Sequence, residues 1–276
     1  MIHLSGADLV LPDRVLTGGT ITIEGDRIVD IEGARFPDLQ FTFRDHYIVP
    51  GFIDVHVHGI AGTDSLDGGE AIRIIAERLP RYGVTAFCPT SIACDPAALR
   101  TMLNGVRAAR TTRPPGGARV LPAHLESNFI SAEYRGAQPL DCLRSPRAES
   151  DTGQTGAGQR SRSFTGADIL TEIAAARPDV GIVTVAPELD GALELIHELV
   201  VHGHHVSLGH SGATYEQAIE AVRAGARQAT HLFNRMTPVA HRTPGLAGAV
   251  LECDDVIAEL VCDGIHVHPA MMRVAL

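Results

Sequence analysis

Two histidines separated by one residue, His56 and His58, lie at the end of an apolar segment, residues 48–57, that has the composition of a β-strand. Side chains two apart in a strand point to the same side, so both imidazoles can face one point. Three further residues, Glu126, His210 and His231, lie at the ends of later strand-like apolar segments. Imidazole and carboxylate ligands together suit zinc, iron or a related divalent ion, and a catalytic site keeps one coordination position for water. The pattern therefore predicts a divalent metal site.

Each of these residues has a simpler interpretation when it is taken alone. An H-x-H pair arises easily by chance in a chain with 14 histidines. Glu126 could be an ion-pair partner, and His210 could serve the following helix, where Ser211 and Thr214 offer capping hydroxyls. The order of these residues along the chain favours the metal site, because four separate predicted strands each end in a histidine or a glutamate. His124 shares the strand face of Glu126 and could support a ligand. Other histidines are expected to face solvent or to support a helix end: His202, His204 and His205.

Strand-like and helix-like segments alternate along the chain from residue 48 onward. Helix-like segments are expected over residues 69–80, 96–110, 190–202 and 214–224. The strand-like segments begin at Ile48, Thr85, Arg119, Gly181, His205, Gln228 and Val256. This alternation predicts an α/β fold, a TIM-like (β/α)8 barrel that lacks its last strand. A barrel of this kind has its active site at the carboxyl ends of its strands, which is where the candidate ligands are expected.

Two domains are predicted. Alternating apolar residues around Glu24-Gly25-Asp26 predict a β-hairpin over residues 20–31, and residues 1–47 are expected to form a small β-sandwich-like domain. Residues 48–276 are expected to form the barrel. Residues 145–165 are rich in Ser, Gly, Arg and Gln, a composition that buries little apolar surface, so a flexible insertion is expected there.

The composition limits the classes of partner. With a net charge of −10, the chain gives no electrostatic reason to bind nucleic acid or an anionic membrane surface. The N-terminus lacks the pattern of a signal peptide, and no apolar run approaches the roughly 18 residues of a membrane span. Five cysteines without a C-x-x-C pair argue against a disulfide framework and fit a reducing cytoplasm.

Several sequence strings, taken in order, resemble the N-acetylglucosamine-6-phosphate deacetylases of the amidohydrolase superfamily. VPGFIDVHVHG at residues 49–59 marks only the superfamily, whereas THLFNRM at 230–236 and DGIHVH at 263–268 mark the deacetylase branch. The other matching strings are GVTAFCPT at 83–90, HLE at 124–126, VTVAPE at 183–188, GHSGAT at 209–214 and PGLAGA at 244–249.

The resemblance implies roles for the matching residues. Glu126, His210 and His231 match the main metal ligands, and His56 and His58 match the ligands of a second ion, which some members bind and others lack. The implied ions are zinc or iron. Sugar-binding positions of the family match Asn234, the backbone of Arg235, and His266. Arg242 matches a position that reaches the phosphate bound by the neighbouring subunit, so a homodimer is implied; a guanidinium suits phosphate through bidentate hydrogen bonds.

The implied reaction is metal-assisted hydrolysis of the acetamide, giving glucosamine 6-phosphate and acetate. An aspartate that moves the proton is expected roughly twenty residues past Asp263, beyond Leu276, so the chain is expected to be cut short before its catalytic residue. Two departures from the family stand out. Ser127-Asn128 replaces Gly-Pro after the glutamate, and Gln138 replaces a histidine that steadies the carbonyl oxygen. Gln138 can still donate to an oxyanion, but not as a cation.

Two alternatives stay open at this point. The chain could bind a metal without turnover, because the expected aspartate lies outside it. It could also be another amidohydrolase that acts on a cyclic amide or an N-acyl amino acid, in which case Arg242 would be only a solvated charge in a loop.

Overall fold

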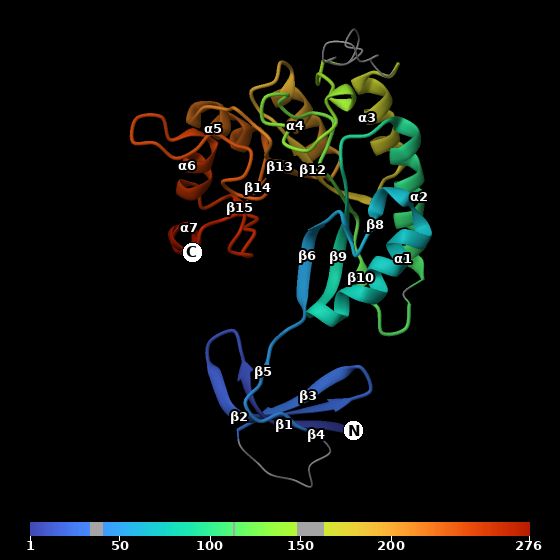
Figure 1. Cartoon of the computed structure of the whole chain (residues 1–276), viewed down its shortest axis with the longest axis vertical. Coiled ribbons are helices and arrows are strands. Elements are labelled where there is room, and N and C mark those ends of the chain that lie inside the picture. Colours follow the sequence, from blue (N-terminus) through green and yellow to red (C-terminus); the bar gives the residue numbers. More distant parts are fainter. Residues whose placement is uncertain (34–40, 113, 148–162) are drawn as a thin grey trace. The chain divides into compact units, whose positions relative to one another are not determined.

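The computed structural model describes residues 1–33, 41–112, 114–147 and 163–276 (Figure 1). Apart from its first and last three residues, the insertion predicted at 145–165 lies outside this described part. The chain divides into two compact units, Met1–Phe52 and Ile53–Leu276.

The first unit is a five-stranded sheet. Its strands are β1 (Ile2–Val10), β2 (Val15–Glu24), β3 (Arg27–Glu32), β4 (Phe41–Thr42) and β5 (Tyr47–Ile48). The predicted hairpin is confirmed: β2 and β3 pair antiparallel, and Gly25 occupies the turn at φ 61°, which glycine adopts without steric cost. A small core of Ala7, Leu9 and Ile21 is buried.

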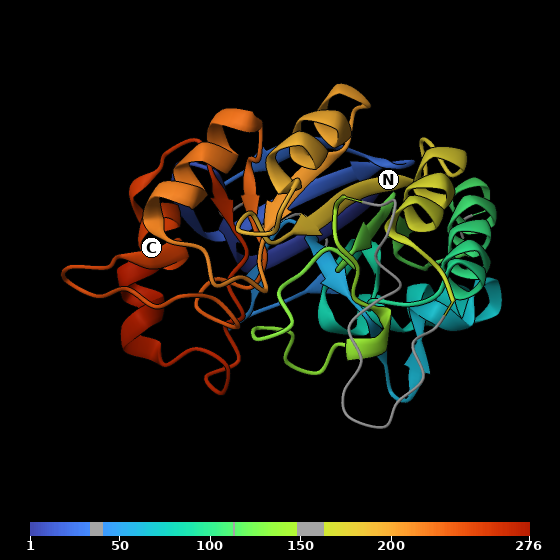
Figure 2. The same ribbon diagram turned by 90° about the horizontal axis from the view of Figure 1, so that it is seen from above.

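The second unit is a curved parallel sheet with helices along its outer side (Figure 2). Its strands are β6 (Phe52–Val57), β9 (Val84–Ser91), β10 (Arg119–Val120), β11 (Ala123–Leu125), β12 (Val180–Val185), β13 (His205–Leu208), β14 (Gln228–Ala229) and β15 (Ile257–Ala258). β10 and β11 are two parts of one predicted strand, which Pro122 interrupts because proline has no N–H for the ladder. In the described residues, β6 and β15 lie at the two open edges of the barrel sheet, so the predicted incomplete TIM-like barrel is confirmed.

Helices connect these strands and cover the sheet. They are α1 (Gly69–Arg78), α2 (Pro96–Thr111), α3 (Gly166–Ala175), α4 (Ala192–Val201), α5 (Tyr215–Ala224), α6 (Gly245–Glu252) and α7 (Pro269–Ala275). Short elements complete the unit: β7 (Gly59–Ile60), β8 (Thr63–Asp64), and the 3-10 turns η1 (Ser65–Asp67), η2 (Leu79–Tyr82) and η3 (Leu140–Cys142). The four predicted helices are confirmed, whereas α3, α6 and α7 were not predicted. Within the described residues, no helix has both the length and the apolar character needed to cross a membrane.

The barrel core is made of strand side chains and one face of each helix. Ile72 and Ile75 of α1 are fully buried, at the spacing that places side chains on one helix face. Phe87, Val183 and Leu208 are fully buried strand residues. Burying a large apolar side chain contributes about 1.5–3 kcal/mol, so this layer holds the strand ends in place.

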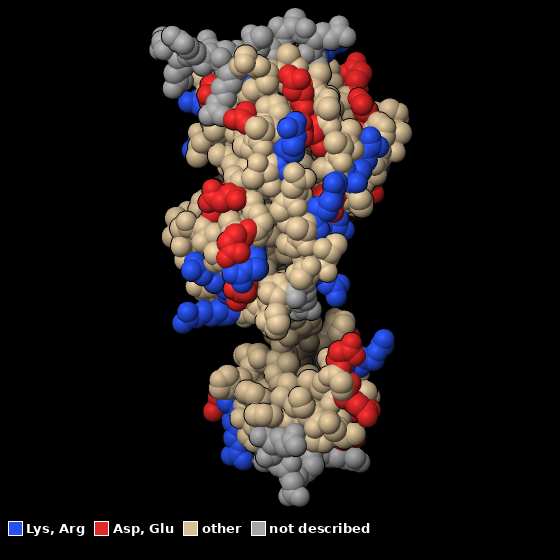
Figure 3. Space-filling view, turned by 90° about the vertical axis from the view of Figure 1, so that its right-hand side faces the viewer, with Lys and Arg blue, Asp and Glu red and all other residues tan. Residues whose placement is uncertain are grey.

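Ion pairs join the outer helices to the sheet and to one another. Arg107 Nε lies 2.7 Å from Asp179 Oδ2, and Arg110 pairs with the other oxygen of the same buried carboxylate. Arg100 Nε lies 2.9 Å from Glu172 Oε2, which joins α2 to α3. Over the second unit, Figure 3 shows basic and acidic side chains mixed on the face it presents.

Candidate metal centre

The five predicted ligands come together at the carboxyl ends of the barrel strands. His56 lies near the end of β6 and His58 directly follows it; Glu126 directly follows β11, and the other two lie two residues beyond β13 and β14. Parallel strands end at the same edge of a sheet, so residues far apart in the chain become neighbours. Two overlapping groups result: an inner cluster of Glu126, His210 and His231, and an outer cluster of His56, His58 and Glu126.

The inner cluster is tight and nearly closed to solvent. Glu126 Oε1 lies 2.8 Å from His210 Nε2 and 2.9 Å from His231 Nε2. The two Nε2 atoms are 3.1 Å apart. Ligand atoms on one tetrahedral zinc, with bonds of about 2.0–2.1 Å, are separated by about 3.3 Å. The inner cluster therefore has nearly the spacing that a small cation requires.

The outer cluster shares the same carboxylate. His56 Nε2 and His58 Nε2 are 3.1 Å apart, and His58 Nε2 lies 3.2 Å from Glu126 Oε2. His56 Nε2 lies 3.7 Å from Glu126 Oε1. Glu126 thus faces the histidines of both clusters: Oε2 lies near His58, whereas Oε1 lies near His56 and the two inner histidines.

The protonation of His210 shows why this donor set fits a cation. His210 Nδ1 lies 2.9 Å from the carbonyl oxygen of Tyr134, which can only accept, so the ring carries a proton on Nδ1. In the neutral ring, Nε2 then presents a lone pair to the oxygen of Glu126 and to the Nε2 of His231. Electron-rich atoms at such distances repel one another unless positive charge lies between them, and a divalent ion supplies it to all three at once.

Glu126 stays ionised despite its burial. Burial alone would raise the pKa of this carboxyl. When no ion lies between them and the Nε2 atoms of His210, His231 and His58 carry a proton, their hydrogen bonds to Glu126 hold the pKa well below its usual range. Gln138 donates from Nε2 to Glu126 Oε2 and accepts from the backbone N–H of Ala93 at 2.7 Å. The position predicted to contact substrate thus also orients the shared ligand.

The backbone at the inner cluster is unusual. His210 has φ 48° and His231 has φ 34°, in the left-handed region that non-glycine residues seldom adopt. Neighbouring contacts hold the first of these turns: Glu188 accepts from Ser211 Oγ at 2.7 Å and from the N–H of Gly212 at 2.5 Å. Strained backbone held by surrounding structure is concentrated at functional sites.

Two residues close to the ligands lie outside the predicted ligand set: Glu259 was not selected from the sequence, and His124 was named only as a possible support for a ligand. Glu259 directly follows β15, and its Oε2 lies 2.9 Å from His56 Nδ1. His124 is fully buried, with Nδ1 2.9 Å from the carbonyl of Val55 and Nε2 2.9 Å from Thr184 Oγ1. Burial lowers the pKa of His124 to about 4, so its ring is neutral near pH 7. Glu259 could have been found by the rule that found Glu126, a carboxylate directly after a strand, had the strand predicted to begin at Val256 been predicted to end at Ala258.

The predicted sugar and phosphate contacts lie at different depths. Asn234 Nδ2 is 3.3 Å from the carbonyl oxygen of His231, next to the inner cluster, and Arg235, which is exposed, follows it in the same turn. Arg242 is exposed and lines a hollow of about 260 Å³. His266 is also exposed, and its Nδ1 lies 2.6 Å from Asp263 Oδ2.

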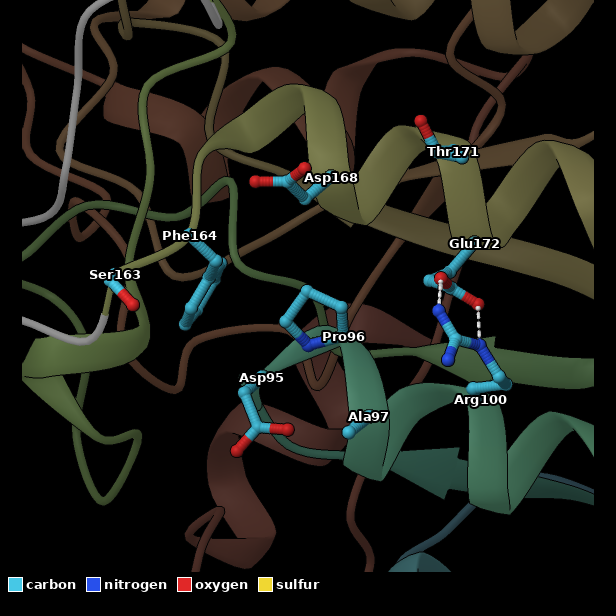
Figure 4. A pocket seen from close by; sticks show the side chains of 9 residues that line it. All are labelled: Asp95, Pro96, Ala97, Arg100, Ser163, Phe164, Asp168, Thr171 and Glu172. Atoms are coloured by element: carbon cyan, nitrogen blue, oxygen red, sulfur yellow. Dashed lines mark hydrogen bonds and ion pairs between the residues drawn. The ribbon is translucent and has the colours of Figure 1, made fainter.

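A second, larger hollow of about 860 Å³ lies between the first turns of α2 and α3 (Figure 4). Its charged side chains already serve the fold. Asp95 caps α2 by accepting from the N–H of Ala98 at 2.9 Å, Asp168 belongs to the capping box of α3, and Arg100 is paired with Glu172. This hollow therefore has a structural explanation and lacks the histidines that distinguish the candidate centre.

A curved parallel sheet with outer helices, and with histidine and glutamate ligands at its carboxyl edge, defines a hydrolase-type barrel that could hold a divalent ion. The chain belongs to the amidohydrolase family, whose model matches residues 47–276.

Within this family, the chain is similar to N-acetylglucosamine-6-phosphate deacetylases. The chain is 37% identical to the N-acetylglucosamine-6-phosphate deacetylase of Mus musculus, over 95% of this chain and 64% of that protein. It is 34% identical to the enzyme of the same name from Bacillus subtilis, over 97% of this chain and 65% of that protein. The chain thus spans less than two thirds of the length of these relatives.

Solved structures of deacetylases with this name are similar to the chain as well. The N-acetyl-D-glucosamine-6-phosphate deacetylase of Mycobacterium smegmatis superposes with a TM-score of 0.83 at 30% identity, covering 100% of this chain and 73% of that chain. An aspartate-to-alanine mutant of the Mycobacterium smegmatis deacetylase, in complex with N-acetyl-D-glucosamine-6-phosphate, has a TM-score of 0.79 at 30% identity, covering 99% of this chain and 66% of that chain.

Proposed function

We propose that the protein hydrolyses the acetamide of N-acetylglucosamine 6-phosphate to glucosamine 6-phosphate and acetate, at a divalent metal centre held by the inner and outer clusters. The observation that carries the proposal is the convergence of four imidazoles on the buried carboxylate of Glu126. Relatives of 34–37% identity that carry the name of this activity support the choice of substrate.

The protein's own residues have distinct tasks in this reaction. Glu126, ionised and held by Gln138, binds the cation together with His210 and His231. When bound, a divalent ion polarises the acetamide carbonyl and lowers the pKa of its water from 15.7 to about 7. Gln138 has a second amide N–H that it can offer to the carbonyl oxygen, because an amide carries two donors.

The remaining assignments concern the sugar, the phosphate and the assembly. Asn234, the backbone of Arg235, and His266 are proposed to bind the sugar. Arg242 is proposed to bind the phosphate of the neighbouring subunit's substrate in a homodimer, and its exposure allows this. Zinc or iron is the proposed ion, and the cytoplasm is the proposed compartment.

Acetate release from phosphorylated and free N-acetylglucosamine tests the proposal. The purified 276-residue chain, loaded with zinc or iron(II), is expected to prefer the phosphorylated sugar. Arg242→Ala should lower kcat/KM for that sugar by about 10- to 100-fold and leave the free sugar nearly unchanged, because a charge-assisted hydrogen bond contributes about 1.5–3 kcal/mol.

The matched control is Arg223→Ala, which removes an exposed arginine from the last turn of α5. This variant should retain the wild-type preference. Equal rates on the two sugars would contradict the phosphate assignment. Bound metal without acetate release from either sugar would contradict the proposed activity of this chain.

A further inference from the structure

We propose that Glu259 is a positioning residue of the metal centre, whose carboxylate fixes the ring of His56 so that Nε2 faces the outer cluster. The inference rests on the proposed metal function, because it assigns a partner to one of the proposed ligands. It adds a residue that neither the H-x-H pattern nor the resemblance selects.

Glu259 connects the two open edges of the barrel sheet. It follows β15, whereas His56 lies in β6, and the sheet order places these two strands at opposite ends of the described sheet. The backbone of Glu259 is fixed on both sides: its N–H donates to Ala229 at 2.9 Å, and its carbonyl accepts from Leu232 at 2.7 Å. The carboxylate is therefore presented from a held strand end rather than from a loose loop.

The contact determines which nitrogen of His56 can bind a metal. A carboxylate only accepts hydrogen bonds, so the 2.9 Å contact between Glu259 Oε2 and His56 Nδ1 requires the proton on Nδ1. The lone pair then lies on Nε2, which is 3.1 Å from His58 Nε2. A carboxylate behind a metal-binding histidine fixes the tautomer and the ring orientation and raises the basicity of the ligand.

The four candidate imidazoles differ in this respect. His210 Nδ1 is held by a neutral backbone carbonyl. The Nδ1 atoms of His58 and His231 are buried and have no hydrogen-bond partner among the described residues. His56 is thus the ligand held by a negative charge, and the loss of Glu259 should weaken the outer cluster more than the inner one.

Glu259 is better suited to orient His56 than to bind an ion itself. Its Oε2 accepts from His56 Nδ1 at 2.9 Å and, at the longer distance of 3.4 Å, from the backbone N–H of His231, and its Oε1 accepts from Gln228 Nε2 at 2.5 Å. His124 lies close to it, but both of its ring nitrogens have other partners, the Val55 carbonyl and Thr184 Oγ1. A group of His56, His124 and Glu259 would have to break these hydrogen bonds before it could take up a cation.

The test compares the wild-type 276-residue chain with Glu259→Leu and Glu259→Gln, and Glu172→Gln serves as the matched control. The side chain of Glu172 is 10% exposed, as is that of Glu259, but it is paired with Arg100 on the outer helices. Two quantities are measured. Nitrogen-15 NMR of the metal-free protein gives the His56 tautomer, and competition with a chromophoric chelator gives Co²⁺ affinity. His58→Ala identifies the binding phase that belongs to the outer cluster.

Wild type should show His56 protonated on Nδ1, and Glu259→Leu should lose this preference. Glu259→Leu should weaken outer-cluster Co²⁺ binding by about 10- to 100-fold and change inner-cluster binding little. Glu259→Gln keeps a hydrogen-bond acceptor, so it should change the His56 tautomer and the Co²⁺ affinity less than Glu259→Leu does. This second variant keeps the test possible if Glu259→Leu folds poorly. Glu172→Gln should change neither quantity.

An unchanged tautomer and unchanged Co²⁺ affinity in a folded Glu259 variant would overturn the inference. Equal weakening of both clusters, or X-ray absorption that identifies a carboxylate lost in Glu259→Gln as a direct Co²⁺ ligand, would also overturn it. Neither quantity depends on turnover. A chain that binds Co²⁺ and responds as expected, but releases no acetate, would therefore contradict the proposed function and leave this inference intact.

Discussion

The inner and outer clusters share Glu126 but are built in different ways. The outer pair lies at the end of a regular strand, where simple alternation aims His56 and His58 at one point. The inner pair lies in strained turns beyond short strands, with positive φ at both His210 and His231. The exposed fraction of the side chain is 39% for His58 and 5% for His210. The inner cluster is therefore the more protected and preorganised of the two, and it should bind its ion more tightly.

The largest effect is expected from the residue that the clusters share. Glu126→Gln removes the negative charge facing both sets of histidines, so metal binding at both clusters should fall sharply. Acetate release should fall by more than about 100-fold, because even the loss of a residue that only hydrogen-bonds to a metal ligand lowers affinity or activity by up to that amount. Metal content per chain and initial rates measure this. Glu133→Gln, at an exposed position, is the control and should behave as wild type.

The second-largest effect distinguishes the contribution of the inner cluster from that of the outer cluster. His210→Ala should reduce Co²⁺ affinity and turnover by about 100-fold, whereas His58→Ala should reduce them by about 10-fold, because only the first removes a buried, oriented ligand. Titration of both variants under identical conditions gives the ratio. A larger loss in His58→Ala would reverse the proposed ranking of the clusters.

Metal removal should reduce stability. An ion present at about 100 times its dissociation constant stabilises the folded state by about 2.7 kcal/mol, which corresponds to a rise in Tm of roughly 5–10 °C for a domain of this size. Thermal unfolding with zinc and with a chelator measures the shift. Glu126→Gln should show almost no response to zinc, and a zinc response equal to that of wild type would show that the ion binds elsewhere.

The smallest effect lies away from both clusters. His204, expected to face solvent or support a helix end, is instead buried, with Nδ1 3.0 Å from the Val180 carbonyl. Burial, followed by the charges of Arg177, His202 and His205, lowers its pKa below the ordinary 6.5, against the hydrogen bond to Val180. Below pH 6.5, His204 binds a proton in the unfolded chain more readily than in the folded chain. The contribution of His204 to the free energy of unfolding is therefore present above pH 6.5 and declines as the pH falls towards the lowered pKa.

His204→Gln tests this, because glutamine can donate to the same carbonyl without titrating. Wild type should lose more Tm than the variant between pH 7.5 and pH 5.5, two values chosen on either side of the ordinary histidine pKa of about 6.5. Parallel Tm curves for the two proteins would contradict the assignment.

The sequence predicted the part of the site that depends on local pattern. Seven strand starts and the H-x-H pair follow from apolar periodicity, and the convergence of Glu126 with His210 follows from the rule that parallel strands end at one edge. The helix at residues 214–224 was predicted with nearly its true bounds, Tyr215–Ala224, and Thr214, named as a capping residue, forms a capping box with Gln217.

Non-local features escaped prediction. A strand was predicted to begin at Val256, but β15 has only two residues, Ile257–Ala258, and its end directly before Glu259 was not predicted. Glu259 lies near several other acidic residues, and nothing in the sequence connects it to His56. The hydrogen bond from Gln138 to Glu126 depends on the path of a loop. α6 begins directly after Pro244 at a glycine with φ 64°, a combination that predicts a turn rather than a helix.

The most direct test of the central claim is an anomalous-scattering map from crystals of the protein soaked in zinc. A peak is expected within about 2.0–2.2 Å of Glu126 Oε1, His210 Nε2 and His231 Nε2, with a weaker peak beside His56 and His58. A map with no peak between these side chains, or crystal coordinates in which His210 and His231 lie apart, would contradict the account.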